Sequence, residues 1–239
     1  MNIVVPMAGL GTRFSSSGFS LPKPLIPIQG KPMIQRAVDS IGQAGNYVFI
    51  IQNNPKINDV LKSMYPASAI IQIDYVTDGP ASTCLLAKKY ISNDEPLLIF
   101  NCDQIMWWDA AAFSMYLESC DYDGVVVTYT ESTPKNSYAK LNRNGRVVKV
   151  VEKEVISNVS LNGIHFWKRG HDFISSAESM ISQNEKYNNE FYVGPTYNGL
   201  IKEGKKIGIY HIPNEQHHAV GTPEDLLKYT NKLYNHENI

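Results

Sequence analysis

The stretch that decides the fold is Met7–Phe14, MAGLGTRF, which directly follows the short apolar segment 2–6. The apolar segment predicts a buried strand. The glycines of the loop allow close approach of the backbone to a ligand and positive φ angles. Successive N–H groups in such a loop can form an anion-binding concavity. Because ligands of open α/β sheets bind beyond the carboxyl ends of the strands, the stretch predicts a phosphate-binding loop.

Two cations follow the glycines. The guanidinium of Arg13 can hold two phosphate oxygens, and Lys23 adds a compact charge. Pro22 and Pro24 restrict the backbone around Lys23, so its charge is held in place. Each piece alone would be typical of an ordinary glycine-rich turn or proline-rich surface loop. The loop is neither a Walker A sequence, which needs GK[ST], nor a complete GxGxxG motif.

Apolar runs and helical patterns alternate along the first half of the chain. This alternation predicts an α/β fold, Rossmann-like, with a mixed, mainly parallel sheet and helices on both faces. We expect strands at 47–51, 69–76, 97–101 and 125–130, and helices at 33–44, 57–64, 82–91 and 109–118.

The second half has a more antiparallel pattern. Asn144-Gly145 predicts a hairpin turn, and a last helix is expected to begin at Pro223 with Thr222 as its N-cap. No long linker or repeat separates the halves, so we expect a single domain over residues 1–239. The remaining expected elements are strands at 147–152, 164–167 and 207–212 and helices at 171–183 and 196–203.

Composition excludes several classes of protein. The 239 residues carry 22 basic and 23 acidic side chains, a net charge of −1, whereas nucleic-acid-binding domains are usually strongly basic. No apolar run is long enough to span a bilayer, and the N-terminus lacks the basic region of a signal peptide. Cys84, Cys102 and Cys120 form no CxxC pair and are typical of reduced thiols. We expect a soluble, cytoplasmic protein with neither nucleic acid nor membrane as a partner; the sequence leaves open whether it forms a homo-oligomer.

The combination of motifs in the first 33 residues resembles the N-terminal signature of the sugar-nucleotide pyrophosphorylase family of nucleotidyltransferases. The family pattern GxGxR, PKP and GKPM is matched at 9–13, 22–24 and 30–33. Weaker matches follow at 79–82, 101–103, 151–153, 162–164 and 221–226. The opening is most similar to small capsule- and lipopolysaccharide-pathway members, among them phosphoglutamine cytidylyltransferases. The resemblance implies a nucleotidyltransferase fold with a nucleotide-binding half at about 1–130 and an acceptor-binding half at about 131–239.

The family reaction is attack by an acceptor phosphate oxygen on the α-phosphorus of an NTP, with release of pyrophosphate. The resemblance implies catalytic roles for Arg13 on the departing phosphates, for Lys23 near the reacting centre and for Asp103 on a metal. Two cations facing the roughly four negative charges of a triphosphate are insufficient, so Mg²⁺ is the expected cofactor. The implied nucleotide-binding residues are Met7, Ala8, Gly9, Gly11, Thr12, Arg13, Lys23, Gly79, Pro80, Ala81 and Ser82.

The metal site departs from the family pattern. Asp103 ends a predicted strand and so faces the ligand crevice, although an Asp there can instead initiate a turn. The second metal-binding aspartate of the family is replaced by Ala219. The metal would then depend on Asp103 and phosphates, or on a histidine, for which His217 is our candidate. A histidine pair such as His217-His218 is otherwise structural or exposed.

The acceptor is expected to meet residues of the second half. By resemblance, Lys153 holds the acceptor phosphate and Glu152 a hydroxyl or amine, while Asn162 and Gly163 line the same pocket. Glu190 and Tyr192 complete the acceptor-binding set. Taken alone, the Glu-Lys pair would be typical of a solvated hairpin edge.

The expected function is therefore transfer of NMP from an NTP, with CTP favoured, to a small phosphorylated metabolite for capsule or surface polysaccharide synthesis. Phosphoglutamine, giving CDP-glutamine, is one acceptor, and heptose- or hexose-1-phosphate with guanylyl or thymidylyl transfer is the alternative. A glycosyltransferase would favour a DxD motif, but Asn101-Cys102-Asp103 is only NxD. A non-catalytic nucleotide-binding homologue would favour loss of Arg13, Lys23 or Asp103, and all three are present.

Overall fold

The computed structural model describes residues 1–237, so the expected domain range ends two residues beyond the described chain. The first strand, β1 (Asn2–Met7), lies inside a nine-stranded sheet and pairs in parallel with a strand on each side. From one edge the order is β10-β9-β11-β6-β1-β4-β5, and β8 pairs with both β11 and β12. These strands are β4 (Asn46–Gln52), β5 (Ala69–Ile73), β6 (Leu97–Phe100), β8 (Gly124–Thr130), β9 (Ser137–Leu141), β10 (Val147–Glu152), β11 (Val159–Trp167) and β12 (Ile207–His211).

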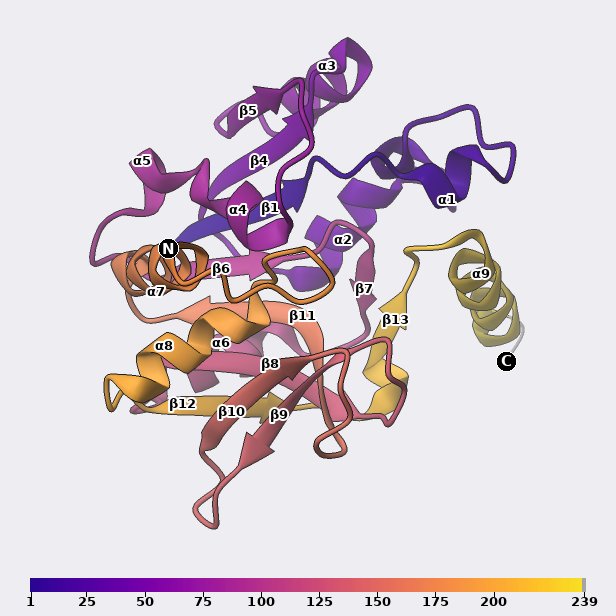
Figure 1. The fold of residues 1–239 in the computed structure, drawn as a ribbon. Helices are drawn as coiled ribbons and strands as arrows, with labels where there is room; N and C mark the ends of the chain where they lie inside the picture. Colours follow the sequence, from indigo (N-terminus) through magenta and orange to yellow (C-terminus); the bar gives the residue numbers. More distant parts are fainter. Residues whose placement is uncertain (238–239) are drawn as a thin grey trace.

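The pairing of the strands changes from parallel to antiparallel at β11. From β6 through β1 and β4 to β5 all pairings are parallel, whereas β11 is antiparallel to β6, β8 and β9. The hairpin β9–β10 projects from this antiparallel side (Figure 1). The predicted α/β fold with a mixed sheet and a more antiparallel second half is confirmed.

Helices cover both faces of the sheet, as expected. On one face α2 (Met33–Ile41), α3 (Pro55–Met64) and α6 (Ala110–Ser119) bury side chains in a shared hydrophobic cluster. On the other face α4 (Pro80–Leu85), α5 (Lys88–Ile91), α7 (Gly170–Ser182) and α8 (Tyr197–Lys202) contribute to a second cluster. No helix within residues 1–237 has the length and apolar character needed to cross a bilayer.

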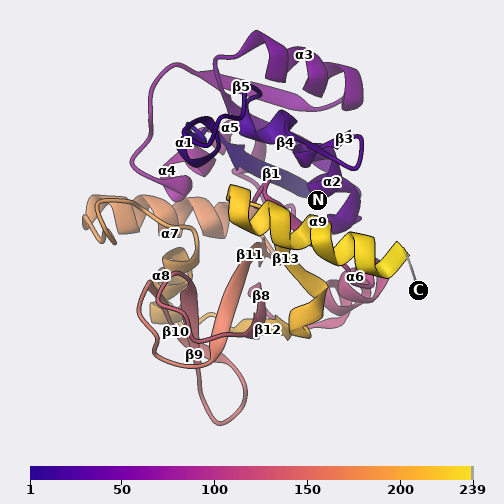
Figure 2. The same ribbon diagram turned by 90° about the vertical axis from the view of Figure 1, so that its right-hand side faces the viewer.

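The last helix, α9 (Pro223–Glu237), forms a third, smaller cluster with the N-terminal loop region. Figure 2 shows it passing in front of the sheet, close to the short strand β13 (His217–Ala219). Thr222 caps its N-terminus, because its hydroxyl oxygen accepts a hydrogen bond from Asp225 N (3.1 Å). The predicted start of this helix is confirmed.

Four expected elements differ from the structure by three residues or more. The helix predicted at 33–44 ends at Ile41, where Gly42 adopts a left-handed conformation (φ 61°), and the strand predicted at 164–167 already begins at Val159. The strand predicted at 69–76 ends at Ile73, because the chain then leaves the sheet and Tyr75 O accepts from the side chain of Gln52 (3.0 Å). The helix predicted at 82–91 is split into α4 and α5. At the break, Leu86 N and Ala87 N bond to carbonyls only three residues earlier, a tighter turn than an α-helix.

Several short elements have no signal in the sequence because two to four residues are too few to show hydrophobic periodicity. They are β2 (Pro27–Ile28), β3 (Lys31–Pro32), β7 (Gln104–Met106), β13, α1 (Thr12–Ser15) and the 3₁₀ turns η1 (Lys23–Leu25), η2 (Gly194–Thr196) and η3 (Asn214–Gln216). The three cysteines form no disulfide, as expected.

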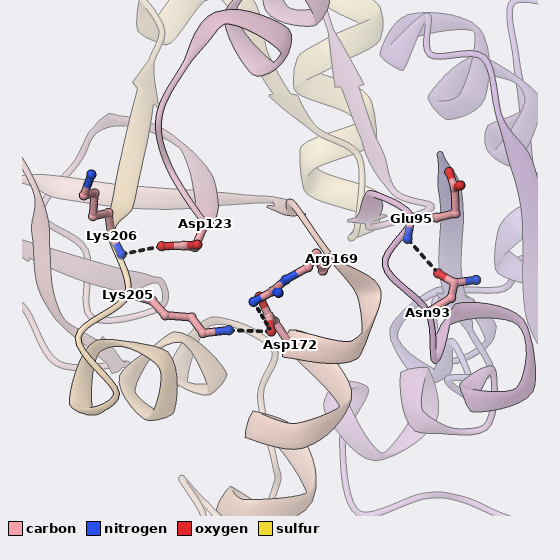
Figure 3. A network of polar contacts seen from close by, with 7 residues as sticks. All are labelled: Asn93, Glu95, Asp123, Arg169, Asp172, Lys205 and Lys206. Atoms are coloured by element: carbon pink, nitrogen blue, oxygen red, sulfur yellow. Dashed lines mark hydrogen bonds and ion pairs between the residues drawn. The ribbon is translucent and has the colours of Figure 1, made fainter.

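A buried carboxylate fixes α7 against the sheet (Figure 3). Asp172, 3% exposed, accepts from the guanidinium of Arg169 at 3.3 Å and from the ammonium of Lys205 at 2.5 Å. Nearby, Lys206 N donates to a carboxylate oxygen of Asp123 at 2.8 Å. This network joins the start of α7 to the start of β12, on the side of the sheet away from the loop after β1.

Candidate functional site

A cavity of about 1030 Å³ opens beyond the carboxyl ends of β1 and β6, beside the bulged part of β11. Its walls come from both halves of the chain, which lie side by side here. Of the residues singled out in the sequence, eight line it: Arg13, Pro80, Asp103, Glu152, Asn162, Gly163, Tyr192 and His217. The carboxyl ends of the parallel strands β1 and β6 bring Arg13 and Asp103 to the cavity. The residues of the second half reach it through the antiparallel strand β11 and the β9–β10 hairpin.

The glycine loop packs directly on the lysine turn. Gly11 has a left-handed conformation (φ 63°) and begins α1, and a Cβ there would lie 3.1 Å from Cβ of Lys23. Glycine at this position therefore lets the loop and the turn η1 touch. Arg13 follows in α1 with an exposed side chain on the cavity wall, so its guanidinium is free to reach a ligand.

Lys23 and Asp103 form an ion pair at the end of β6. Burial alone would lower the pKa of Lys23, but the carboxylate of Asp103 outweighs burial and raises it, so the ammonium stays charged. The backbone around Asp103 is also fixed, since Val220 N donates to its carbonyl (2.9 Å). A Cβ on Gly221 would lie 2.6 Å from Oδ2 of Asp103, so only glycine fits beside this carboxylate.

The donor set at Asp103 fits a magnesium ion that takes most of its ligands from substrate. Within residues 1–237 there is no group of three His, Cys, Asp or Glu side chains that could hold a metal. Ala219, at the place of the family's second aspartate, lines the cavity and supplies no ligand. Mg²⁺ is commonly held by one or two carboxylates together with phosphate oxygens and water, which is what Asp103 and a triphosphate provide.

His217 lies in the cavity wall on β13, but its ring already contacts other side chains of the protein. Its Nδ1 lies 3.3 Å from Nε2 of Gln104, and its ring is tilted by 36° against the ring of Tyr129, with centroids 4.4 Å apart. Burial lowers the pKa of His217 to about 4, and the neighbouring His218 adds to this effect. The imidazole is therefore neutral near pH 7.

The segment expected to meet the base is fixed to the second half of the chain. Ala81 N donates to Phe191 O (2.9 Å), and Phe191 N donates to Asp78 O (2.7 Å). A Cβ on Gly79 (φ 115°) would lie 2.6 Å from Phe191 N, so glycine is required for this contact. Ala81 N is thus occupied by the protein, and Pro80 has no N–H. Ser82 is partly buried and does not line the cavity.

The first part of the phosphate loop also makes contacts of its own. Met7 and Ala8 are buried, and Ala8 O accepts from Nε2 of Gln52 at 2.6 Å. Gly9 and Thr12 are exposed. The exposed positions are the ones left open for a ligand.

A bulge in β11 shapes the end of the cavity where the sequence predicts the acceptor. Leu161 pairs with Thr128 and His165 with Val126, so β11 has two extra residues here. Bulges of this kind re-aim side chains near sites. Gly163 (φ 95°) sits in the bulge, and a Cβ there would lie 2.3 Å from the side-chain nitrogen of Asn101. The Oδ1 of Asn162 accepts from Ile164 N (3.0 Å), so this side chain stabilises the bulge as well as lining the cavity.

Glu152 and Lys153 end β10 and point to different partners. Glu152 is 6% exposed and accepts a hydrogen bond from Ser137; burial raises its pKa. Lys153 has φ 54°, which is uncommon for a residue with a side chain, and its N–H donates to Asn136 O (2.9 Å). Its ammonium donates to the hydroxyl of Tyr192, which donates in turn to Glu190. Glu190 is thus connected to the cavity through Tyr192.

Sequence reasoning missed several cavity residues in both halves. Ser137 contacts Glu152 across the β9–β10 hairpin, and only the hairpin register brings them together. The other polar residues that were missed are Ser16, Ser17, Asn101, Gln104, Tyr129, Glu131, Thr133, Lys135, Asn136, His165 and Lys228. The one signal for Gln104 in the sequence is that it directly follows the proposed metal ligand.

Comparisons with known proteins show which family and which fold this chain shares. The sequence profile of the MobA-like NTP transferase domain matches residues 3–165. The bifunctional protein GlmU of Methanococcus maripaludis is 26% identical over 242 residues, covering 98% of this chain and 55% of the relative. A mannose-1-phosphate guanyltransferase of Aspergillus fumigatus is 26% identical over 165 residues, 65% of this chain and 45% of that protein. The chain thus spans about half the length of the curated relatives it matches.

Solved structures share the fold. A nucleoside-diphosphate-sugar pyrophosphorylase from Vibrio cholerae superposes with a TM-score of 0.84 at 22% identity, covering 96% of this chain and 99% of the other. The CTP:phosphocholine cytidylyltransferase LicC of Streptococcus pneumoniae gives a TM-score of 0.75 at 17% identity, covering 97% and 98%. These likenesses confirm the predicted nucleotidyltransferase fold.

Proposed function

Because the chain belongs to the MobA-like NTP transferase family, we propose that it transfers NMP from an NTP to a small phosphorylated acceptor. The observation that carries the proposal is that Arg13 and Asp103 line one cavity shared by both halves, where Asp103 forms an ion pair with Lys23. This arrangement offers cationic groups for a triphosphate, a carboxylate for a metal and room for a second substrate. We propose residues 1–130 as the nucleotide half and 131–239 as the acceptor half.

The proposed reaction needs positioning and charge neutralisation rather than a covalent nucleophile. An acceptor phosphate oxygen forms a bond to the α-phosphorus, the bond to the β-phosphate oxygen breaks, and pyrophosphate leaves with the electron pair. Arg13 holds the departing phosphates, and Lys23 lies near the α-phosphate. Asp103 would hold Mg²⁺, which neutralises charge on the phosphates. Lys153 binds the acceptor phosphate, directed by Tyr192.

We favour CTP as the nucleotide, phosphoglutamine as one acceptor and capsule or surface polysaccharide precursors as the destination. The motif resemblance of the opening supports this choice, and the fold shared with LicC is compatible with it. Heptose- or hexose-1-phosphate with guanylyl or thymidylyl transfer is the alternative. A structural relative titled glucose-1-phosphate thymidylyltransferase shares the fold with a TM-score of 0.76 at 18% identity.

Pyrophosphate release over a matrix of four NTPs and a panel of phosphorylated acceptors tests the proposal. We expect release that depends on Mg²⁺, that is fastest with CTP and that requires an acceptor. EDTA should stop it, and added Mg²⁺ should restore it. No release with any pair, or equal release without metal, would contradict the proposal. Faster release with GTP or TTP and a sugar phosphate would favour the alternative.

A further inference from the structure

Two polar side chains in the proposed acceptor end of the cavity each have a buried atom without a hydrogen-bond partner. His165 of β11 is 7% exposed and Gln104 of β7 is 2% exposed, and both line the cavity. The side chain of His165 makes no hydrogen bond within residues 1–237, and its Nδ1 is sealed from solvent. Oε1 of Gln104 is also buried without a donor. Buried polar groups are nearly always hydrogen-bonded, so two unsatisfied side chains in one cavity wall point to a ligand that completes them.

The rest of each side chain is held in place by the protein. Nε2 of Gln104 lies 3.5 Å from the sulfur of Met106 and 3.3 Å from Nδ1 of His217. The ring of His165 is stacked with Trp167 and Tyr197, with centroids 6.0 and 5.9 Å apart. The unsatisfied atoms therefore belong to side chains with defined positions.

The bulge of β11 explains why both side chains reach the cavity. A Cβ on Gly163 would lie 3.0 Å from Oε1 of Gln104, so the missing side chain leaves room for the amide. His165 is the first residue after the bulge to pair again with β8. The terminal torsion of an amide is broad and roughly two-fold, so rotation of Gln104 presents oxygen or nitrogen without moving the backbone.

The wall that these residues form is neutral. Burial lowers the pKa of His165 to about 3, so its ring is uncharged near pH 7 and has one N–H and one lone pair. Gln104 is an amide, and the adjacent His217 is neutral for the same reason as His165. Such a wall can select dipoles and hydrogen-bonding groups, whereas it offers nothing to a fixed charge.

We propose that Gln104 and His165 select the acceptor by hydrogen bonding to neutral donor groups of its body, either hydroxyl or carboxamide groups. This inference rests on the proposed function, because the acceptor phosphate is taken to be held by Lys153. A hydroxyl or amide of the acceptor would bond to the second ring nitrogen of His165, since Nδ1 is sealed from solvent, and to the amide of Gln104 once it has rotated toward the cavity. An acceptor without such groups leaves both side chains unsatisfied. Gln104 and His165 determine which acceptor binds, whereas the reacting phosphate is held by Lys153.

Three phosphate monoesters of similar size test the inference by calorimetric titration. Glycerol 3-phosphate has hydroxyls, phosphoglycolamide has a carboxamide, and n-propyl phosphate has neither. Each is titrated into protein saturated with Mg²⁺ and a non-hydrolysable analogue of the preferred NTP. The variants are His165→Phe and Gln104→Met, with His165→Asn as partial rescue. His171→Phe is the control, because His171 is exposed on α7.

We expect wild type to bind at least one donor-bearing ester about 3- to 10-fold more tightly than n-propyl phosphate, the range of one or two hydrogen bonds. The ratio should fall towards one in His165→Phe and Gln104→Met, recover partly in His165→Asn and stay unchanged in His171→Phe. The two donor-bearing esters distinguish hydroxyl from carboxamide recognition. If one variant fails to fold, the other gives the same comparison.

Equal binding of all three esters by wild type, or a ratio retained in both variants, would overturn the inference. So would failure of all three to bind while the NTP analogue binds normally. In that last case the proposed function would still be decided by the pyrophosphate matrix. Loss of NTP binding as well would count against the proposed function itself.

Discussion

The two ends of the cavity differ in how they hold charge. At the nucleotide end, the Lys23–Asp103 pair and Arg13 keep full charges partly or largely open to solvent. At the acceptor end, Gln104, His165 and the neighbouring His217 form a buried neutral wall. The first arrangement suits the neutralisation of a triphosphate, whereas the second suits discrimination among small molecules. Under the proposed function, one end of the cavity would provide binding strength and the other would select the acceptor.

Removal of the charge pair is expected to have the largest effect. Lys23→Ala or Asp103→Ala should reduce the rate of pyrophosphate release by about 10²–10³, because a preorganised electrostatic contact is lost. The measurement is saturation kinetics beside a thermal melt. Lys31→Ala is the matched control, since Lys31 is in the same motif region but pairs with Asp39 on the surface at 2.8 Å. Near-normal turnover in a folded Lys23→Ala protein would disprove the assignment.

The contact between the two halves can be broken at Gly79. Gly79→Ala should lower the free energy of unfolding by about 2–4 kcal/mol, from left-handed strain plus the clash with Phe191 N. Gly145 also has a positive φ (75°) but no atom within 4 Å of a new Cβ, so Gly145→Ala measures positive-φ strain without a clash and should cost about 1–2 kcal/mol. Equal losses in urea unfolding would show that the approach to Phe191 has no steric cost.

The hydroxyl of Tyr192 should have a smaller effect. Tyr192→Phe removes the acceptor of the Lys153 hydrogen bond and leaves the ring, so kcat/KM for the acceptor should fall about 5- to 10-fold. Affinity for the NTP should be unchanged. Tyr187→Phe, on the same segment but outside the cavity, is the control. A loss confined to NTP affinity would mean that Tyr192 acts at the other end.

The neutral wall predicts a pH dependence of stability. Because the pKa of His165 is about 3 in the folded chain against 6.5 ordinarily, the unfolded chain takes up the proton first as pH falls. Stability should therefore decrease below pH 6.5, by about 1 kcal/mol per pH unit for this residue. His165→Phe should show a shallower decrease between pH 6 and 4 in urea unfolding, and exposed His171→Phe should not. Parallel curves for wild type and His165→Phe would contradict a neutral buried imidazole.

The nucleotide end of the cavity could be predicted from the sequence more completely than the acceptor end, for physical reasons. The loop with Arg13 and the lysine turn with Lys23 are contiguous motifs directly after one strand, so their convergence follows from local order. The acceptor end joins the β11 bulge, the β9–β10 hairpin and the short strand β7. A bulge and three-residue strands leave no periodicity to read. His165 appears in the sequence as one more residue of a strand, and only the fold shows that it lacks a partner.

The division of work between the ends is tested most directly by Arg13→Ala and Lys153→Ala together. Each variant is titrated calorimetrically with the preferred NTP and Mg²⁺, and acceptor saturation kinetics are measured beside it. The account predicts that Arg13→Ala weakens NTP binding first. Lys153→Ala should keep NTP affinity and lose acceptor kcat and KM together, because its contact to the nucleophile strengthens in the transition state. A Lys153→Ala protein with NTP affinity as weak as that of Arg13→Ala and an unchanged acceptor KM would contradict it.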